Sequence, residues 1–293
     1  MTDDIRSQAI ELYDRFTHEG MDRRDLLSAM TRLTGSAVAA SLLIGSISAC
    51  AEATPMVDDK DKTLHTGTTT LLGTGGRPAY LAYFAEPKSR PKAIPTVMVI
   101  HENRGLNDHI RDVARRLAKA GYHAVALDML SPTGGTPANE DQAREAIGKL
   151  DLAKSVDDAV AMLGELGTRK GGNGKVGAIG FCWGGAFINR LAVAAGPALA
   201  AGVSYYGPAP APAEAAKVSA PLLIQLAGLD TRVAATADPW IEALKAAGKT
   251  VEAFTYPNVN HAFNNDTSAE RYDKAAAELA WSRTLAFFKR YLA

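Results

Sequence analysis

The stretch GAIGFCWGGAF, residues 177–187, decides the fold of this 293-residue chain. It begins as a short apolar run after Lys175, which is typical of a buried parallel strand. Beyond Cys182, small and apolar residues follow at helical spacing. A strand that turns into a helix within about two residues strains the turning residue, and Gly180 and Gly184 leave room for it. The stretch therefore predicts a strand, a tight turn at Cys182 and a helix.

A strand, turn and helix of this kind form a nucleophile elbow, here with cysteine at the turning position. The elbow lifts the sulfur clear of the sheet edge. It also aims the first backbone amides of the helix at the same spot, where a thiolate and an oxyanion are both stabilised. A buried structural cysteine in a glycine-rich turn is the alternative interpretation. The choice depends on whether an acid and a base follow.

An acid and a base follow in the chain order nucleophile, acid, base. Asp230 comes just past the carboxyl end of an apolar strand predicted at 221–228, and His261 follows a strand predicted at 251–256. Loops at the carboxyl ends of strands in an open α/β sheet converge on one crevice, so both side chains can meet Cys182. We expect the imidazole to act as the base and Asp230 to orient it through the other ring nitrogen.

Four motifs, HENRG at 101–105, GFCWGG, GLD and NHAF, resemble the dienelactone hydrolase family of α/β-hydrolases over residues 65–293. The resemblance implies an α/β-hydrolase fold, with a mostly parallel central sheet flanked by helices. It also implies that Cys182 is the nucleophile, with Asp230 as its acid and His261 as its base. The resemblance further implies that the Glu102 carboxylate contacts the resting thiol. The implied oxyanion hole consists of the backbone amides of Trp183 and Asn103.

One position departs from the family. The arginine that binds the lactone carboxylate four residues after the catalytic histidine is replaced by Asn265, and we expect Asp266 to repel an acidic ligand. A neutral ester or lactone is therefore at least as good a substrate candidate as the dienelactone. The candidate substrate contacts are Arg104, Tyr205, Tyr206 and Phe263, although Arg104 could instead neutralise Glu102 and the tyrosines could fill the core.

The composition is that of one large globular α/β domain, with 47% hydrophobic residues and no formal net charge. The absence of a basic excess argues against a nucleic-acid partner. The sequence contains neither a Cys-x-x-Cys nor a His-Glu-x-x-His motif, so we expect no metal and no cofactor. The expected partner is a small-molecule substrate, and we expect a monomer.

The first 55 residues are interpreted as a leader. A polar segment with a helical apolar rhythm spans residues 1–20, the pair Arg23-Arg24 follows, and Leu33–Ala49 carries no charge. This order is typical of a secretory signal, and the arginine pair suggests the twin-arginine route to the periplasm. An N-terminal membrane anchor and an ordinary amphipathic helix are the alternatives.

Cys50 lies where the leader ends. It could be acylated as a lipid anchor or lost by simple cleavage at the neighbouring small residues. Residues 56–64 are charged and are interpreted as a linker, and the segment Thr68–Phe84 predicts a β-hairpin that covers one sheet edge.

These patterns indicate an exported, cysteine-dependent hydrolase of carboxylic esters or lactones, with a carboxymethylenebutenolidase-type reaction through an acyl-enzyme on Cys182. A thioesterase or acyl transferase on the same elbow is one alternative. An inactive exported binding protein is another. Asp128 is a less favoured acid because it precedes the nucleophile, and His101 is expected to be a packing or hydrogen-bonding residue.

Overall fold

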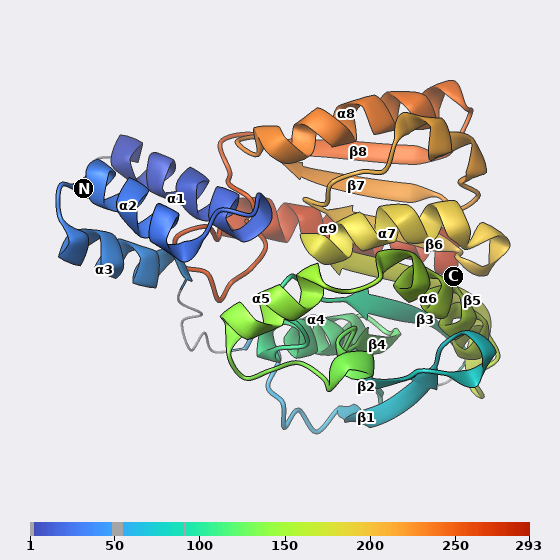
Figure 1. Ribbon diagram of the computed structural model, residues 1–293. Helices are drawn as coiled ribbons and strands as arrows, with labels where there is room; N and C mark the ends of the chain where they lie inside the picture. The colour runs from blue at the N-terminus through green and yellow to red at the C-terminus, as the bar shows by residue number, and fades with distance from the viewer. Residues whose placement is uncertain (1–2, 49–54, 91) are drawn as a thin grey trace.

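The computed structural model describes residues 3–48, 55–90 and 92–293 (Figure 1). The helices are α1 Asp3–His18, α2 Arg23–Thr34, α3 Ala37–Ser48, α4 Asp108–Lys119, α5 Glu140–Gly148, α6 Leu152–Gly167, α7 Trp183–Ala194, α8 Thr231–Ala246 and α9 Lys274–Leu292. The strands are β1 Leu64–Leu72, β2 Ala79–Pro87, β3 Ile94–Ile100, β4 His123–Leu127, β5 Gly172–Phe181, β6 Ala201–Tyr205, β7 Leu222–Ala227 and β8 Val251–Tyr256. Cys50 and its expected processing lie outside the described residues.

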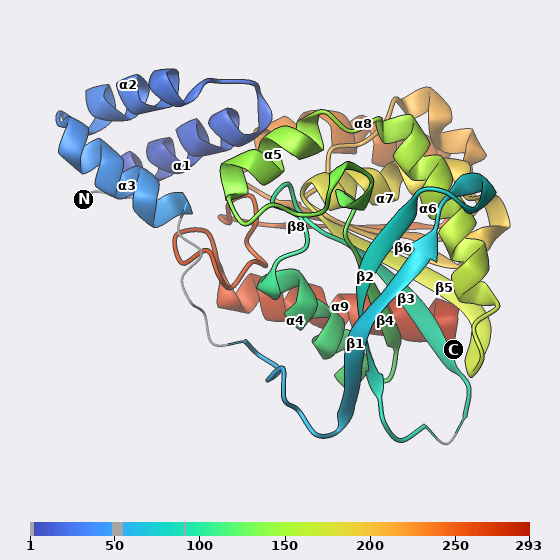
Figure 2. The ribbon, with the colours of Figure 1, turned by 60° about the horizontal axis from the view of Figure 1, so that its bottom comes forward.

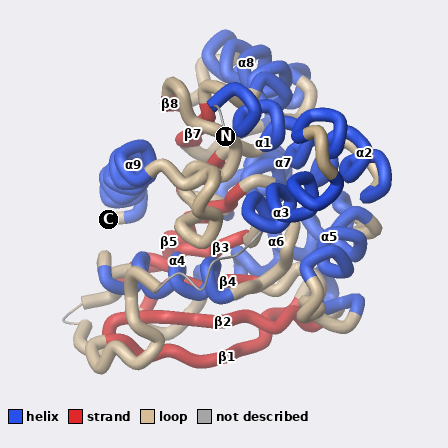
Figure 3. The backbone as a smooth tube through the Cα atoms, turned by 90° about the vertical axis from the view of Figure 1, so that its left-hand side faces the viewer, coloured by secondary structure: helices blue, strands red, loops and turns tan. Residues whose placement is uncertain are grey.

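The strands form one sheet in the order β1-β2-β4-β3-β5-β6-β7-β8. The pairs from β4 through β3 to β8 are parallel, whereas β1 and β2 pair antiparallel and β2 pairs antiparallel with β4. Helices α4 and α9 pack on one face of the sheet, and α6, α7 and α8 pack on the other (Figure 3). The predicted α/β class is confirmed, including the hairpin at one sheet edge.

Side-chain caps fix where several helices begin. Asn107 accepts a hydrogen bond from the Ile110 amide at 3.1 Å and starts α4. Helices α5 and α6 are separate because Asp151 caps α6 by accepting from the Lys154 amide at 3.0 Å. Asp273 caps α9 by accepting from the Ala276 amide, so this helix begins at Lys274.

The elbow depends on close backbone packing. Cys182 has φ 55° and ψ −114°, a strained conformation for a residue with a side chain. A methyl group added at Gly184 would lie 2.5 Å from the carbonyl oxygen of His101 and closer still to that of Ile100. One added at Gly180 would overlap the Gly184 carbonyl. These two glycines therefore let α7 begin directly against β3 and β5.

Helices α1, α2 and α3 form a small unit with an apolar core of its own. That core includes Ile10, Phe16, Leu26, Met30 and Leu43, all of them buried. The unit stands at one end of the sheet, beside the segments that lead into α5 and α9 (Figures 1 and 2). No single helix among the described residues is long and apolar enough to cross a membrane; α2 and α3 would be so together, but the pair is bent by 113°. We call α1–α3 the cap.

We expect Gly184→Ala to destabilise the protein by at least about 1–3 kcal/mol, because the added methyl overlaps backbone that cannot move independently of the sheet. The matched control is Gly164→Ala, in the last turn of α6, where an added methyl meets nothing within 4 Å. That variant should be stabilised by about 0.4–1 kcal/mol. Denaturant unfolding measures both, and equal stability of the two variants would refute this account of the elbow.

Candidate active site

The nucleophile candidate is held by the elbow at the start of α7. The Cys182 amide donates to the carbonyl of Tyr205 at 3.0 Å, which ties the turn to the end of β6. Trp183 is the first residue of α7, so its N–H is one of the four at the helix start that have no acceptor within the helix. Asn103 follows the end of β3 and lines the cavity around Cys182. The two predicted oxyanion-hole residues are thus both beside the sulfur.

The predicted acid and base meet at the carboxyl ends of β7 and β8. Asp230 caps α8 by accepting from the Val233 amide at 3.0 Å, which fixes its carboxylate. Its other oxygen lies 2.5 Å from Nδ1 of His261. Burial would raise the pKa of Asp230, but the His261 imidazolium and the helix-cap hydrogen bond lower it below its usual value.

His261 is buried and electrostatically paired. Burial alone would lower its pKa, but the Cys182 thiolate and the Asp230 carboxylate raise it to about 10. At neutral pH the imidazole is therefore protonated when the thiolate is present. Its Nε2 is buried and has no hydrogen-bond partner among the described residues. This nitrogen remains available to a reacting group.

Glu102 lies in the crevice, but its hydrogen bonds differ from the expected contact with the resting thiol. Its carboxylate accepts from the Tyr206 hydroxyl at 3.3 Å and from Nδ2 of Asn265 at 2.8 Å. The described hydrogen-bond partner of the sulfur is instead Nε2 of His18, at 3.8 Å. Glu102 thus accepts a hydrogen bond from the neutral side chain of Asn265, which stands at the position where the family carries an arginine.

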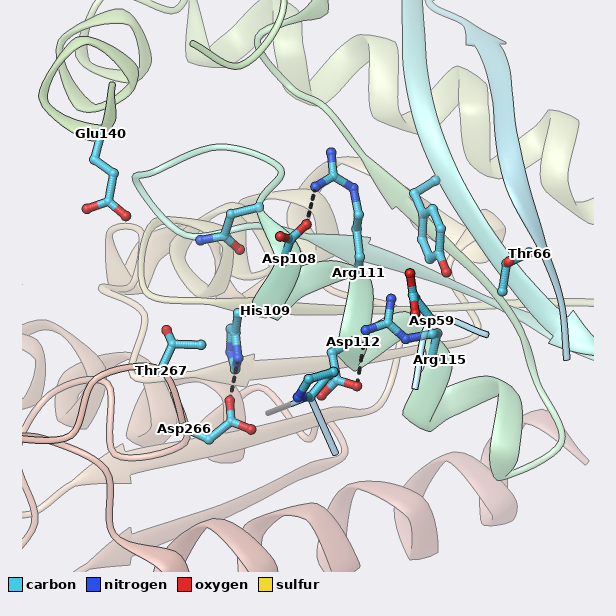
Figure 4. Close-up of a pocket in the computed structure, with 13 residues that line it drawn as sticks. Asp59, Thr66, Asp108, His109, Arg111, Asp112, Arg115, Glu140, Asp266 and Thr267 are labelled. Carbon is cyan, nitrogen blue, oxygen red and sulfur yellow. Dashed lines mark hydrogen bonds and ion pairs between the residues drawn. The ribbon is translucent and has the colours of Figure 1, made fainter. Parts of the chain in front are cut away.

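Asp266 does not act on the crevice as the sequence suggested. Its carboxylate lies 2.7 Å from Nδ1 of His109 (Figure 4). It also lies 2.6 Å from Nη2 of Arg116, and both partners are on α4. Burial would raise the pKa of Asp266, but these two partners lower it. Because its charge is compensated on α4, the expected repulsion of an acidic ligand is not supported.

The candidate substrate contacts divide into two groups. Tyr205 and Phe263 are fully buried in the core beneath the site, and the Tyr205 hydroxyl pairs with Thr284 on α9 at 2.7 Å. Tyr205 fills the core, as its alternative interpretation allowed, and Phe263 lies in the core as well, so its expected substrate contact is not supported. Tyr206 packs its ring 5.0 Å from that of His261, between centroids, so it belongs to the site.

Arg104 lines the same cavity as Glu102 and Cys182. Its guanidinium pairs with Glu140 at 3.0 Å and donates to the hydroxyl of Tyr13 at 3.2 Å. His101 and Asp128 have structural partners. His101 accepts from the Met129 amide at 3.1 Å, and the Asp128 carboxylate accepts from the Thr136 amide at 2.8 Å.

The cap covers the nucleophile, which the sequence did not predict. The cavity at Cys182 has a volume of only about 10 Å³ and is lined by Tyr13, Thr17 and His18 of the α1 helix together with core residues. The rings of His18 and His261 meet edge to face at 4.8 Å. Burial and the neighbouring His261 charge hold the pKa of His18 well below its usual value, so this imidazole is neutral. No spacing motif links residue 18 to the catalytic motifs, so sequence inspection had no signal for it.

Polar contacts dock the cap on the body of the protein. Arg144 donates to the Phe16 carbonyl at 2.8 Å and lies 3.8 Å over the Phe16 ring. Other arginines make the remaining charged contacts: Arg271 with Asp14, Arg6 with Glu270 and Arg23 with Asp141. The cap has its own apolar core and a polar interface, which is the pattern of separable units.

A larger cleft of about 710 Å³ lies beside α4 and does not include Cys182 (Figure 4). Its charged side chains pair with one another. Arg111 contacts Asp108 at 2.7 Å, and Arg115 contacts Asp112 at 3.4 Å. The cleft is therefore a solvated groove with no reactive group assigned to it.

The sequence profile described as the Dienelactone hydrolase family matches residues 81–292. A protein of Methylorubrum extorquens assigned as a carboxymethylenebutenolidase is 33% identical over 288 residues, covering 92% of this chain and 97% of that protein. A Bradyrhizobium protein assigned as a 2-oxo-3-(5-oxofuran-2-ylidene)propanoate lactonase is 30% identical, covering 75% and 93%. The crystal structure of a protein assigned as a dienelactone hydrolase, from Klebsiella pneumoniae, is 30% identical. It superposes with a TM-score of 0.70, covering 78% of this chain and 99% of that one.

Because the cap buries Cys182, we expect this thiol to react slowly with iodoacetamide in the full-length chain. Arg144→Ala should speed its labelling about 5- to 30-fold, since the lost hydrogen bond and cation–π contact together contribute about 1–2 kcal/mol to docking. The matched control is Arg283→Ala, which removes a guanidinium stacked 3.8 Å over Phe254, away from the cap. Mass spectrometry of the Cys182 peptide measures the rate, and equal rates in both variants would contradict the docking scheme.

Proposed function

This chain belongs to the dienelactone hydrolase family and is a hydrolase of ester bonds, and we propose that it works through an acyl-enzyme on Cys182. The observation that carries the proposal is the Asp230–His261 pair, 2.5 Å apart, beside a cysteine on a strained elbow. A structural cysteine would require neither a buried charged pair nor a strained backbone next to it.

In the proposed reaction, the Cys182 thiolate attacks the carbonyl carbon of the substrate. The oxyanion is stabilised by the backbone amides of Trp183 and Asn103, each contributing roughly 10²–10³-fold. His261 gives its proton to the leaving oxygen as the carbon–oxygen bond breaks. A water molecule then attacks the acyl-enzyme, His261 takes its proton, and the acid is released with the thiolate restored.

We propose a neutral carboxylic ester or lactone as the substrate. Asn265 offers no charge to a substrate carboxylate and is already engaged with Glu102 at 2.8 Å. Arg104, which lines the same cavity as Glu102, is paired with Glu140. Faster turnover of a carboxylate-bearing ester than of its neutral counterpart would contradict this choice.

The same proposal gives the first 55 residues two roles. They act as a twin-arginine-like leader that exports the chain to the periplasm, and the cap within them keeps Cys182 covered until the leader is removed. The polar docking of the cap supports such a removal, and residues 56–64 then serve as the linker to the hydrolase domain at 65–293. Recovery from the periplasm of a chain that still begins at residue 1 would refute the leader role.

We expect a brief exposure of the mature chain, from which the leader has been removed, to an activated ester to add one acyl group to Cys182. The adduct should be absent from Cys182→Ala, because that variant lacks the nucleophile while its small side chain leaves the elbow intact. Intact mass and peptide mapping detect the adduct. A chelator is present during the measurement so that no metal ion can block the thiol. An adduct of equal yield in Cys182→Ala would place the chemistry elsewhere.

In the mature chain, from which the leader has been removed, His261→Gln should lower kcat/KM for a short neutral ester by about 10²–10⁴-fold, the contribution of a positioned base. The matched control is His109→Gln, which alters another buried histidine paired with an aspartate, at 2.7 Å from Asp266. The control should keep wild-type kcat/KM, since His109 lies on α4 outside the crevice. Thermal unfolding of both variants verifies the fold, and an equal loss of activity in both would count against His261 as the base.

A further inference from the structure

His18, Cys182 and His261 bring three metal-ligating side chains to one point. One ligand atom from each lies within 4.8 Å of the other two. The sulfur is 3.8 Å from Nε2 of His18. Nδ1 of His261 is held by Asp230, so Nε2 is the ring nitrogen that a cation would bind, with release of the proton that it carries beside the thiolate. The cluster spans two separately packed units, with His18 on the cap and the other two residues in the body of the protein.

We propose that in the full-length chain these three residues form a site for a borderline-soft divalent cation, with Zn²⁺ as the best match. Two imidazole nitrogens and one thiolate are a donor set that zinc prefers over Mg²⁺ or Ca²⁺. Three protein ligands leave a fourth tetrahedral position for water. This assignment replaces the expectation, based on local motifs alone, that the chain holds no metal ligands.

The surroundings fit a metal ligand set in two respects. The Nε2 atom of His261 is buried without a hydrogen-bond partner among the described residues. Its ring belongs to the cluster with His18 and Cys182. Asp230 orients the same ring through Nδ1, which is the carboxylate–histidine arrangement that commonly supports a metal-bound imidazole.

Distances and charges are also compatible. From zinc bond lengths of about 2.0–2.3 Å, ligand atoms in a tetrahedral site lie roughly 3.3–3.8 Å apart. The sulfur and the His18 nitrogen already have that separation, and the largest remaining gap to close is about 1.5 Å, shared between two side chains. Two arginines beside the cavity are each paired with a carboxylate, Arg104 with Glu140 and Arg271 with Asp14.

A bound cation would have two consequences. It would tie α1 to the elbow, because His18 supplies one ligand. It would also occupy the sulfur and the His261 nitrogen, so the uncut chain would be inactive while metal is bound. This second consequence rests on the proposed function, whereas metal binding itself does not.

The test uses the full-length chain in a Cys50→Ser background, in which Cys182 is the sole thiol. Co²⁺ serves as the spectroscopic probe, and competition with a zinc indicator gives the Zn²⁺ affinity. We expect one equivalent of Co²⁺ with a thiolate-to-cobalt charge-transfer band. His18→Ala should weaken Zn²⁺ binding by at least about 100-fold, since even loss of a partner behind a ligand costs 10–100-fold.

Three further variants make the result decisive. Cys182→Ser should abolish the charge-transfer band, and His65→Ala, which removes a half-exposed histidine on β1, should bind as the wild type does. His18→Asn repeats the His18 test with a polar side chain in case the alanine variant unfolds. Unchanged Zn²⁺ affinity in both His18 variants, or no stoichiometric binding with a thiolate band, would overturn the proposal. None of these readouts uses substrate, so failure of the hydrolase assignment would be seen separately.

Discussion

The close approach of α7 to the sheet at Gly180 and Gly184 constrains the rest of the structure. Because no side chain fits between the helix start and the backbone of β3, Cys182 must turn at φ 55° directly above the strand end. The same contact fixes where the first amides of α7 point. The residues after β3, Glu102 and Asn103, therefore face the same small volume as the sulfur.

Around Cys182 the protein holds the charged Asp230–His261 pair in a buried site. Asp230 is held by a helix cap and in turn holds His261, so the imidazole has one orientation. Its raised pKa follows from two neighbouring negative groups that outweigh burial. Glu102 is satisfied by Tyr206 and Asn265, which lets a carboxylate remain in the crevice without acting on the thiol directly.

The cap adds a second level of organisation. Its three helices pack on one another through apolar side chains, but they meet the body through arginines such as Arg144 and through the contact between His18 and Cys182. An interface of this kind is easier to separate than a shared hydrophobic core. A divalent cation held jointly by His18 and the catalytic pair would convert that weak interface into a locked one, and a chelator would release it.

The sequence by itself determined the α/β class, the elbow, the edge hairpin and the order of nucleophile, acid and base, because strand periodicity, glycine placement and short motifs are local signals. It also placed Asp230 and His261 at strand ends that had to converge. Only the tertiary structure decided that Tyr205 and Phe263 are core, that Asp266 faces α4 and that Glu102 is held by Asn265, since these depend on which neighbours lie across the sheet. The position of His18 over Cys182 was likewise beyond the sequence, because 164 residues separate them and only the docking of one packed unit on another brings them together.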